Sequence, residues 1–467
     1  MDDRDGRDPR GGELMTARLS TEVLVIGWGK GGKTLARALG RAGRRVVLVE
    51  RDDTMIGGTC INVACVPTKA LVIQAERRRP EDDPDAYLAR AIASRDTLVE
   101  RLREANRQLL ATVDAVTLVR GEASFTGPHT VRVTGGDEEL EIAGEVVVVN
   151  TGTVPRMPGI DGQDGPRVHD STSIQHLDSV PDRLAIVGAG TIALEFASMF
   201  ARFGSAVTII ARGAGILPDE DDDVRASVEH ALADAGVAVL ADASTTRIDD
   251  GPERATVVTS AGEVAADAVL LATGRAPATA ALDLAAADIR TDERGFVIVD
   301  DLLRTSSRRV WAVGDVTGGQ QLTPISLDDS RIVHAQLTGA EERNRADRVA
   351  VPTAVFTTPP LARVGLTERE ARERGLRVLV GAKPVATIAA MPRPKALGET
   401  HGIIKVVVDA ETDLVLGAAL HSVDAQEVIN LVALAMRAGV TAAELRDGIW
   451  THPSSTEALN EVLGELR

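Results

Sequence analysis

The sequence predicts an α/β protein with two Rossmann-type nucleotide-binding domains and a C-terminal α+β domain. A glycine fingerprint follows the first predicted strand, and the same pattern returns about 160 residues later. After residue 350, short alternating strands and helices replace the strand–turn–helix units. The length agrees, since 467 residues suggest about three domains of ~150 residues each.

The first fingerprint lies near the N-terminus. Its glycines have G-x-G-x-x-G spacing: Gly27, Gly29 and Gly32. It connects a predicted strand, a helix and a second strand over residues 21–26, 33–42 and 45–49. The second strand ends on Glu50, an acid suited to binding a ribose hydroxyl, while the glycines admit a pyrophosphate to the helix N-terminus. This segment is therefore expected to bind a dinucleotide.

The same glycines fit a second motif. A P-loop, G-x-x-x-x-G-K-[ST], is matched by Gly27, Gly32, Lys33 and Thr34. We favour the dinucleotide interpretation because the ribose-binding acid follows at the expected distance and the whole pattern recurs later. A P-loop nucleotide hydrolase is kept as an alternative from another class.

The second fingerprint has the same organisation. Its three positions hold Gly188, Gly190 and Ala193, and the pattern tolerates alanine at the third. It lies between predicted strands over residues 184–187 and 206–210. Two dinucleotide sites in one chain imply that one dinucleotide passes electrons to the other. That is the arrangement of a flavoprotein reduced by a nicotinamide.

The residues that follow the strand over 206–210, in the second fingerprint, indicate which nicotinamide is bound. Ala211 stands where an NAD site places its acid, and Arg212 follows it. A guanidinium in place of a carboxylate suits a 2′-phosphate, which arginine binds in a bidentate fork. NADPH is therefore expected to be preferred over NADH.

Further strands are predicted between and after the fingerprints. Apolar runs over residues 146–149, 270–271 and 310–313 precede turns that contain Gly152, Gly274 and Asp315. The first two runs are expected to carry the crossings between the nucleotide domains, and the third to present an acid to a cofactor. Strands over residues 402–408 and 414–420, with two helices, predict the third domain.

Composition excludes several partners. The 52 basic and 69 acidic residues leave a net charge of −17, which argues against nucleic acid and anionic membranes. Residues 1–20 lack the apolar stretch of a secretory signal and are predicted to form a disordered tail. No run approaches the ~18 apolar residues of a membrane helix, so a cytoplasmic protein is expected.

The two cysteines, Cys60 and Cys65, are five positions apart. In a reducing compartment such a pair is usually catalytic or metal-binding. A zinc site would want two further ligands nearby, and the sequence has none at the usual spacing. We therefore predict a redox-active pair and no metal site.

Residues 57–69, with both fingerprints, resemble the pyridine nucleotide-disulfide oxidoreductases, a class that includes dihydrolipoamide dehydrogenase, glutathione reductase and mercuric reductase. The likeness covers essentially everything after residue 20. It is nearest to the metal-reducing branch with the bacterial reactive-chlorine-resistance flavoprotein, through residues 29–34, 314–319 with 325–329, and 357–365. It implies an FAD-binding domain over 21–155 and 276–345, an NAD(P)H-binding domain over 156–275 and a dimerisation domain over 346–467.

The resemblance implies roles for individual residues. Cys65 would contact the flavin as a thiolate, and Cys60 would attack an external disulfide. Lys69 would lie near the flavin and pair with Glu195. The remaining cofactor contacts implied in this way come from Thr59, Gly152, Gly274 and Asp315.

The C-terminal segment resembles the base of the same family. His452 would exchange protons with the thiols, and Glu457 would fix its tautomer. Because the family uses this segment at the partner subunit's disulfide, the complete site requires a homodimer.

The predicted function is reduction of a small disulfide or an oxidising metal ion such as Cu(II), with FAD and NADPH. Two alternatives are a dithiol dehydrogenase and a redox-sensing flavoprotein. Trp450 stands where dihydrolipoamide dehydrogenases carry a second histidine, which weakens the first alternative. The lack of cysteines beyond Cys65 argues against mercuric reductase.

Overall fold

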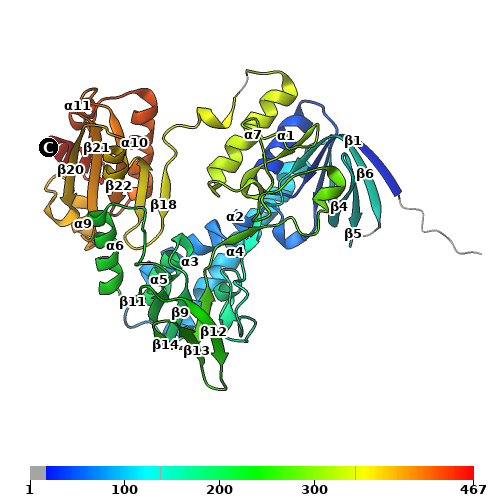
Figure 1. The fold of residues 1–467 in the computed structure, drawn as a ribbon. Helices are drawn as coiled ribbons and strands as arrows, with labels where there is room; N and C mark the ends of the chain where they lie inside the picture. The colour runs from blue at the N-terminus through cyan, green and yellow to red at the C-terminus, as the bar shows by residue number, and fades with distance from the viewer. Residues whose placement is uncertain (1–16, 137, 342) are drawn as a thin grey trace, which may run out of the picture. The chain divides into compact units, whose positions relative to one another are not determined.

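The computed structural model describes residues 17–136, 138–341 and 343–467 (Figure 1). Its contacts divide the chain into two compact units. Most of the predicted tail lies outside the described residues. Residues 17–20, however, are not tail: they begin the first strand and pair with residues 140–143. The tail prediction was therefore wrong for these four residues, because strand β6 extends far enough to provide them with a partner.

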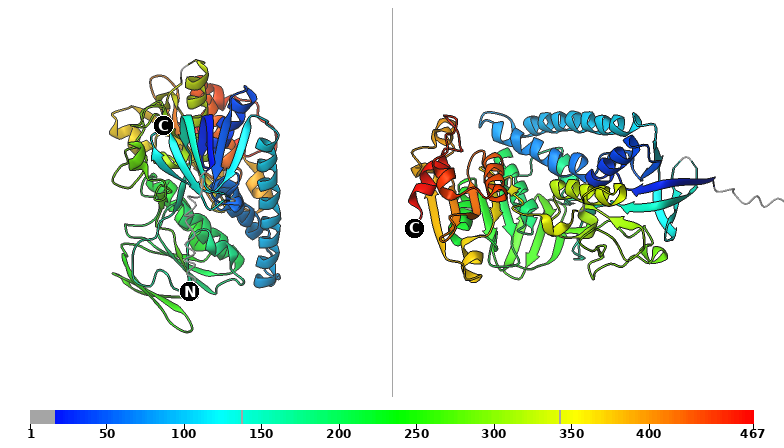
Figure 2. Two further views of the ribbon diagram at one scale, coloured as in Figure 1. Left: turned by 90° about the vertical axis from the view of Figure 1, so that its right-hand side faces the viewer. Right: turned by 90° about the horizontal axis from the view of Figure 1, so that it is seen from above.

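The first unit contains residues 17–62, 100–154 and 276–345 of the described chain. Its sheet has seven strands: β1 (Ala17–Ile26), β2 (Val46–Glu50), β3 (Val116–Arg120), β4 (Glu122–Gly127), β5 (Thr130–Thr134), β6 (Leu140–Val149) and β17 (Val310–Ala312). Its helices are α1 (Lys30–Arg41), α2 (Thr59–Asn62) and α7 (Thr323–Thr338), with the end of α4 (Pro84–Ala111). Figure 2 shows the blue and cyan strands of this sheet side by side.

The order of this sheet is that of a dinucleotide-binding fold. The path runs β3-β2-β1-β6, all parallel, and β17 pairs with β6. Val23 of β1 lies between Val46 of β2 and Val146 of β6, and all three side chains are buried. Such valine-rich parallel strands are covered on both faces, which explains their uninterrupted apolar runs. β4 and β5 form an antiparallel extension.

The second unit contains residues 63–99, 155–275 and 346–467. It repeats the parallel arrangement in the order β11-β10-β9-β15-β8. These strands are β8 (Val168–His169), β9 (Arg183–Val187), β10 (Ala206–Ile210), β11 (Val237–Leu240) and β15 (Ala268–Leu271). The helices α3 (Cys65–Arg77), α5 (Thr191–Phe203) and α6 (Asp222–Asp234) belong to the same unit. A three-stranded antiparallel sheet contains β12 (Thr245–Asp250), β13 (Ala255–Thr259) and β14 (Gly262–Ala266).

The C-terminal part of this unit is an α+β layer. Its antiparallel sheet has the order β18-β19-β22-β21-β20. The strands are β18 (Thr353–Val355), β19 (Leu361–Gly365), β20 (Val378–Pro384), β21 (Ile403–Asp409) and β22 (Val415–His421). The helices are α8 (Glu368–Glu373), α9 (Pro392–Leu397), α10 (Ala425–Ala438), α11 (Ala442–Arg446) and α12 (Ala458–Val462). The predicted fold class, two Rossmann-type domains and an α+β domain, is confirmed. The short strands β7 (Thr153–Pro155) and β16 (Arg275–Pro277) lie where the chain passes between units.

The observed division differs from the predicted domain boundaries. Residues 63–99 group with the second unit, because Leu71 and Val72 of α3 share a buried apolar cluster with Leu194 of α5. Residues 346–467 belong to the same unit, where Lys405 of β21 forms an ion pair with Asp221 at 3.1 Å.

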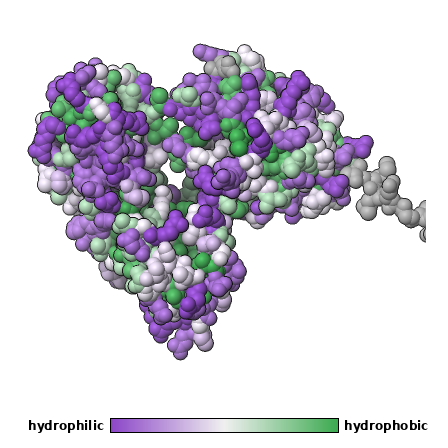
Figure 3. All heavy atoms as spheres, in the orientation of Figure 1, coloured by the Kyte–Doolittle hydropathy of each residue, from purple (hydrophilic) through white to green (hydrophobic). Residues whose placement is uncertain are grey.

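One face of the described chain carries many polar side chains. Hydrophilic residues cover much of the face shown in Figure 3. Among the residues that the structure describes, no helix combines the length and apolar character needed to cross a membrane.

Candidate functional site

The first dinucleotide loop is a tight turn between β1 and α1. Gly27 adopts φ +97°, and a Cβ there would lie 2.5 Å from the Asn150 carbonyl oxygen, so only glycine fits. Gly32 N–H donates to Asn150 Oδ1 at 2.8 Å, and Asn150 Nδ2 donates to the Val313 carbonyl at 2.8 Å. Asn150 thereby ties the loop to the ends of β6 and β17. Sequence analysis missed this residue, although an amide after an all-valine strand is a usable signal.

The acid of this fingerprint holds the loop as well. Glu50 Oε2 accepts the Trp28 N–H at 2.9 Å, and Oε1 accepts the Arg51 N–H at 2.9 Å. Burial raises the pKa of Glu50 despite these backbone donors, which act in the opposite direction. Gly29, the N-cap of α1, has no side-chain cap, and the first turn of α1 contains no acidic residue.

These residues fit an FAD pyrophosphate and ribose. The helix α1 itself contributes no acidic residue in its first turn, and the positive end of a helix favours an anion. The hydroxyl of Thr151, at the C-terminal end of β6, is buried without a hydrogen-bond partner in the described chain. Asp315 lies at the end of β17, where its Oδ2 accepts from Thr153 Oγ1 at 3.5 Å. The residues that would hold FAD are thus the glycines, Glu50, Thr151 and Asp315.

The lysine that suggested a P-loop has a different partner. Lys33 is buried, and its Nζ donates to the Gly57 carbonyl at 3.0 Å and to Asn106 Oδ1 at 2.5 Å. Burial lowers its pKa to about 8; Lys30 acts in the same direction and the Cys60 thiolate opposes it. Thr34 Oγ1 donates back to the Lys30 carbonyl at 2.7 Å. Neither side chain is arranged for a nucleotide phosphate and its magnesium, so the P-loop interpretation is not supported.

The cysteine motif is packed onto the dinucleotide loop. Gly58 has φ +86°, and a Cβ there would lie 2.7 Å from Gly29 Cα. This close approach explains the glycine before Thr59 and fixes where α2 begins. Cys60 is the second residue of α2 and is half-buried. The side chain of Asn62 donates to the carbonyl of Gly58 at 2.9 Å and so closes the loop.

The second cysteine begins another helix. Cys65 is the first residue of α3 and is exposed, with Ala64 as the N-cap. A helix N-terminus favours a thiolate, which suits the thiolate role that the resemblance implies for Cys65. Cys60 lies in its own short helix, α2, rather than at the start of α3.

Lys69 and Glu195 meet as predicted. Lys69 Nζ lies 2.7 Å from Glu195 Oε2, and the Glu195 side chain is only 5% exposed. Glu195 Oε1 accepts the Phe356 N–H at 3.0 Å, and Lys69 Nζ lies 4.8 Å from the centre of the Phe356 ring. Phe356 was missed, because nothing in its local sequence indicates that it meets residues far away in the chain.

The second fingerprint fits a dinucleotide for a different reason. Gly188 has φ +117°, and a Cβ there would collide with the Ala272 carbonyl. Gly190 has the ordinary φ of −83°, and a Cβ there would meet no described atom within 4 Å. Neither backbone conformation nor internal packing therefore requires this glycine, whereas a bound pyrophosphate would. As in the first unit, the N-terminus of α5 has no side-chain cap and no acid in its first turn.

The remaining predicted residues surround these loops within their own units. Ala211 is buried and Arg212 is exposed, directly after β10. Gly152 and Gly274 both have positive φ, of +68° and +109°, and lie at the ends of β6 and β15. The Gly152 carbonyl accepts from Ala278 N, and that of Gly274 accepts from Arg156 N.

The C-terminal pair is also formed. His452 Nδ1 lies 2.9 Å from Glu457 Oε1, and Glu457 Oε2 accepts the Ser454 N–H at 2.8 Å. The hydrogen bond to His452 and then that from Ser454 lower the pKa of Glu457. His452 is exposed, and its Nε2 edge is therefore accessible.

The chain combines two successive dinucleotide-binding folds, a cysteine motif packed on the first of them and an α+β domain. This combination defines a class of oxidoreductases that bind two dinucleotides. The pyridine nucleotide-disulphide oxidoreductase family model matches residues 21–336, and the dimerisation domain of that family matches residues 351–463. The chain belongs to this family and is an oxidoreductase, for which FAD and a nicotinamide nucleotide are the cofactors. The dimerisation domain indicates a homodimer.

Individual relatives agree. The chain is 44% identical over 449 residues to the probable pyridine nucleotide-disulfide oxidoreductase RclA of Escherichia coli, covering 96% of this chain and 99% of that protein. It is 34% identical over 465 residues to dihydrolipoyl dehydrogenase 2 of Haloarcula marismortui, covering 96% and 97%. A solved structure described as the Cu(II) complex of the HOCl-induced flavoprotein disulfide reductase RclA from Escherichia coli superposes with a TM-score of 0.91 at 43% identity, covering 95% of this chain and 99% of that one.

Proposed function

We propose that this protein uses NADPH to reduce a small disulfide or an oxidising metal ion such as Cu(II), through FAD and the Cys60–Cys65 pair. The observation that carries the proposal is the packing of Gly58 against Gly29, which joins the cysteine motif to the dinucleotide loop. The solved Cu(II) complex of the E. coli relative supports the metal ion as acceptor. A cytoplasmic location stays a prediction.

Bound FAD would accept a hydride from the nicotinamide and supply two electrons that reduce the disulfide of the cysteine pair. Cys60 then attacks the external disulfide, which leaves a mixed disulfide and releases one thiol. Cys65 attacks Cys60 in turn, so the second thiol leaves and the pair is again oxidised. For Cu(II), two ions each accept one electron from the reduced pair.

Other residues of the chain would prepare these steps. The 2.7 Å ion pair with Glu195 orients Lys69, while the Phe356 N–H holds the other carboxylate oxygen. Glu457 accepts a hydrogen bond from His452 Nδ1–H, which leaves Nε2 to exchange protons with a thiol of the partner subunit. The exposure of His452 is consistent with a role toward a second subunit.

The preference for NADPH rests on Arg212. Its guanidinium is exposed directly after β10, and the buried Ala211 provides no carboxylate to bind a 2′-hydroxyl or repel a 2′-phosphate. We therefore expect a 2′-phosphate to lie against Arg212.

The test is anaerobic NADPH oxidation by the FAD-loaded protein with a panel of disulfides, Cu(II) and Hg(II), and with NADH in parallel. Turnover of one disulfide would identify a thiol reductase, and turnover confined to a metal ion would identify a metal reductase. The reverse assay, with dihydrolipoamide and NAD(P)⁺, tests the dithiol dehydrogenase alternative, which the relative from Haloarcula marismortui also suggests.

Cys60→Ser is the variant that tests the thiol chemistry. It should lose disulfide turnover while NADPH still reduces its flavin, because Cys60 is assigned only the exchange with the acceptor. Disulfide turnover at the parent rate in this variant would refute the assignment. Reduction by NADPH without multiple turnover of any acceptor, in the parent protein, would instead favour a redox sensor.

A further inference from the structure

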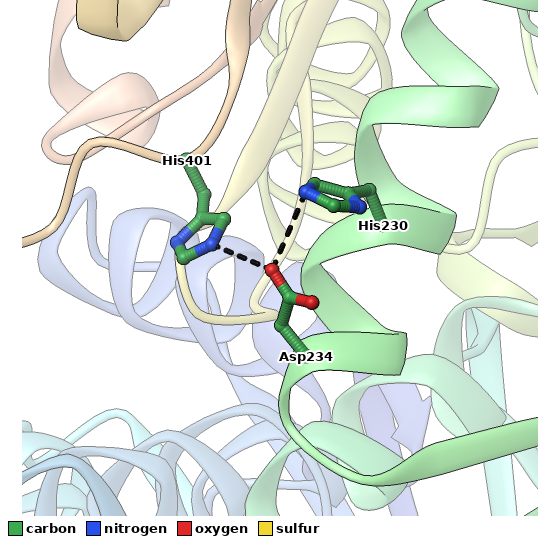
Figure 4. A group of neighbouring side chains, drawn as sticks. All are labelled: His230, Asp234 and His401. Carbon is green, nitrogen blue, oxygen red and sulfur yellow. Dashed lines mark hydrogen bonds and ion pairs between the residues drawn. The ribbon is translucent and has the colours of Figure 1, made fainter.

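Two histidines and an aspartate converge in the second unit, and none of them has a role in the proposed reaction. His230 and Asp234 lie one turn apart on α6, and His401 lies just before β21. Asp234 Oδ2 is 3.4 Å from His230 Nε2 and 3.0 Å from His401 Nε2. Figure 4 shows the three side chains pointing toward one another. Three ligand atoms of the kind that bind metals therefore face a single point.

The side chain of Glu399 fixes the orientation of the His401 ring. Its Nδ1 lies 2.8 Å from Glu399 Oε1, and Glu399 Oε2 lies 3.5 Å from Arg202 Nη2. A carboxylate that accepts a hydrogen bond from one ring nitrogen sets the tautomer and directs the other nitrogen toward Asp234. Metal-binding histidines in proteins are commonly oriented in this way.

We propose that His230, Asp234 and His401 bind one divalent transition-metal ion of the zinc and copper class. The ligands would be the two Nε2 atoms and one carboxylate oxygen, with water completing the coordination. The three ligand atoms lie within 4.8 Å of one another. Ligands ~2.1 Å from a tetrahedral zinc ion lie about 3.4 Å apart, so only small side-chain movements are required.

The donor set selects the class of ion. Two imidazoles and one carboxylate suit zinc, copper and nickel, whereas calcium and magnesium are bound mainly by oxygen atoms. A bound ion would connect α6 to the segment before β21. We therefore expect binding to stabilise the second unit, independently of any metal ion that accepts electrons from Cys60 and Cys65.

The test is titration of Zn²⁺ into the tag-free, FAD-loaded Cys60→Ser/Cys65→Ser protein, followed by calorimetry and by thermal unfolding. The serine replacements prevent the ion from binding to thiols. Co²⁺ is titrated in parallel, because its visible spectrum reports nitrogen and oxygen coordination. We expect one ion per chain and a melting temperature that rises with Zn²⁺.

Four variants and a control decide the outcome. Asp234→Asn and His401→Gln should each weaken binding at least tenfold, and Glu399→Gln should weaken it by about 10- to 100-fold through the orientation of His401. His129→Gln, at a histidine of the first unit, should bind as the parent does. His230→Gln should also weaken binding, and because His230 is exposed on its helix this change does not threaten the fold. No binding by the parent, or parent-like binding by both Asp234→Asn and His401→Gln, would overturn the proposal.

Discussion

Removing the charge of Lys69 should reveal how strongly the Lys69–Glu195 pair stabilises the second unit. The direct attraction at 2.7 Å is about 6 kcal/mol with an effective dielectric constant of about 20, before the desolvation of both groups is subtracted. Lys69→Met leaves a carboxylate whose side chain is 5% exposed, with the Phe356 N–H as its one remaining partner among the described residues. Breaking a buried pair in this way costs about 3–5 kcal/mol. We expect the free energy of unfolding to fall by about 3 kcal/mol, the lower end of this range, because Lys69 itself is 26% exposed.

The double variant separates the charge from the packing. In Lys69→Met/Glu195→Gln no unpaired charge remains, and the glutamine oxygen can still accept from Phe356 N–H. Its loss of stability should therefore be smaller than that of Lys69→Met alone, by about 1–3 kcal/mol. The free energy of unfolding is measured in urea on the FAD-loaded protein, with circular dichroism as the signal.

A surface pair provides the matched control. Arg377 Nη2 lies 2.6 Å from Glu411 Oε1, but these side chains are 75% and 65% exposed. Arg377→Met should therefore cost less than ~1 kcal/mol. If Lys69→Met costs no more than Arg377→Met, the inference that burial makes the Lys69–Glu195 pair strong is wrong.

Three further predictions concern other buried or charged groups. Burial lowers the pKa of His421 from 6.5 to about 4, so the unfolded chain binds a proton at a higher pH than the folded protein does. The free energy of unfolding should therefore fall by up to ~3 kcal/mol as the pH drops from 6.5 to about 4. Urea unfolding at a series of pH values should show a flatter dependence for His421→Asn. Arg212→Glu should shift the ratio of kcat/KM for NADPH and NADH toward NADH by about 10-fold or more, while the exposed Arg254→Glu should leave it unchanged. Lys33→Met should destabilise the first unit by about 1–3 kcal/mol, because the buried Gly57 carbonyl and the half-buried Asn106 Oδ1 lose their donor. Neither the variant nor the parent should hydrolyse ATP, and hydrolysis lost only in the variant would restore the P-loop interpretation.

The elements that local patterns specify were predicted closely. The strand over residues 206–210 has the predicted bounds as β10. Helix α1 was expected to begin at Lys33 but begins at Lys30, because Gly31 and Gly32 belong to its first turn. Side chains at these positions would collide with Ser326 and Asn150, so packing rather than helix propensity placed glycines there.

The sequence by itself determined the two dinucleotide folds, the cysteine pair and the partnership of His452 with Glu457. Glycine spacing and alternation act over a few residues, and the pairing of His452 with Glu457, which the family resemblance implied, is formed in the structure. Only the tertiary structure decided that Lys33 turns toward the Gly57 carbonyl and that Asn150 ties the first loop to its sheet.

The sequence could not predict the groups formed by residues that lie far apart in the chain, and the reason is physical. His401 was left unassigned and no metal site was predicted, because its neighbours His230 and Asp234 lie about 170 residues away and meet it only through the path of the chain. In the same way, residues 63–99 join the second unit because α3 finds its apolar partner in α5. Spacing along a chain encodes local geometry, whereas contacts between distant segments depend on how the layers pack.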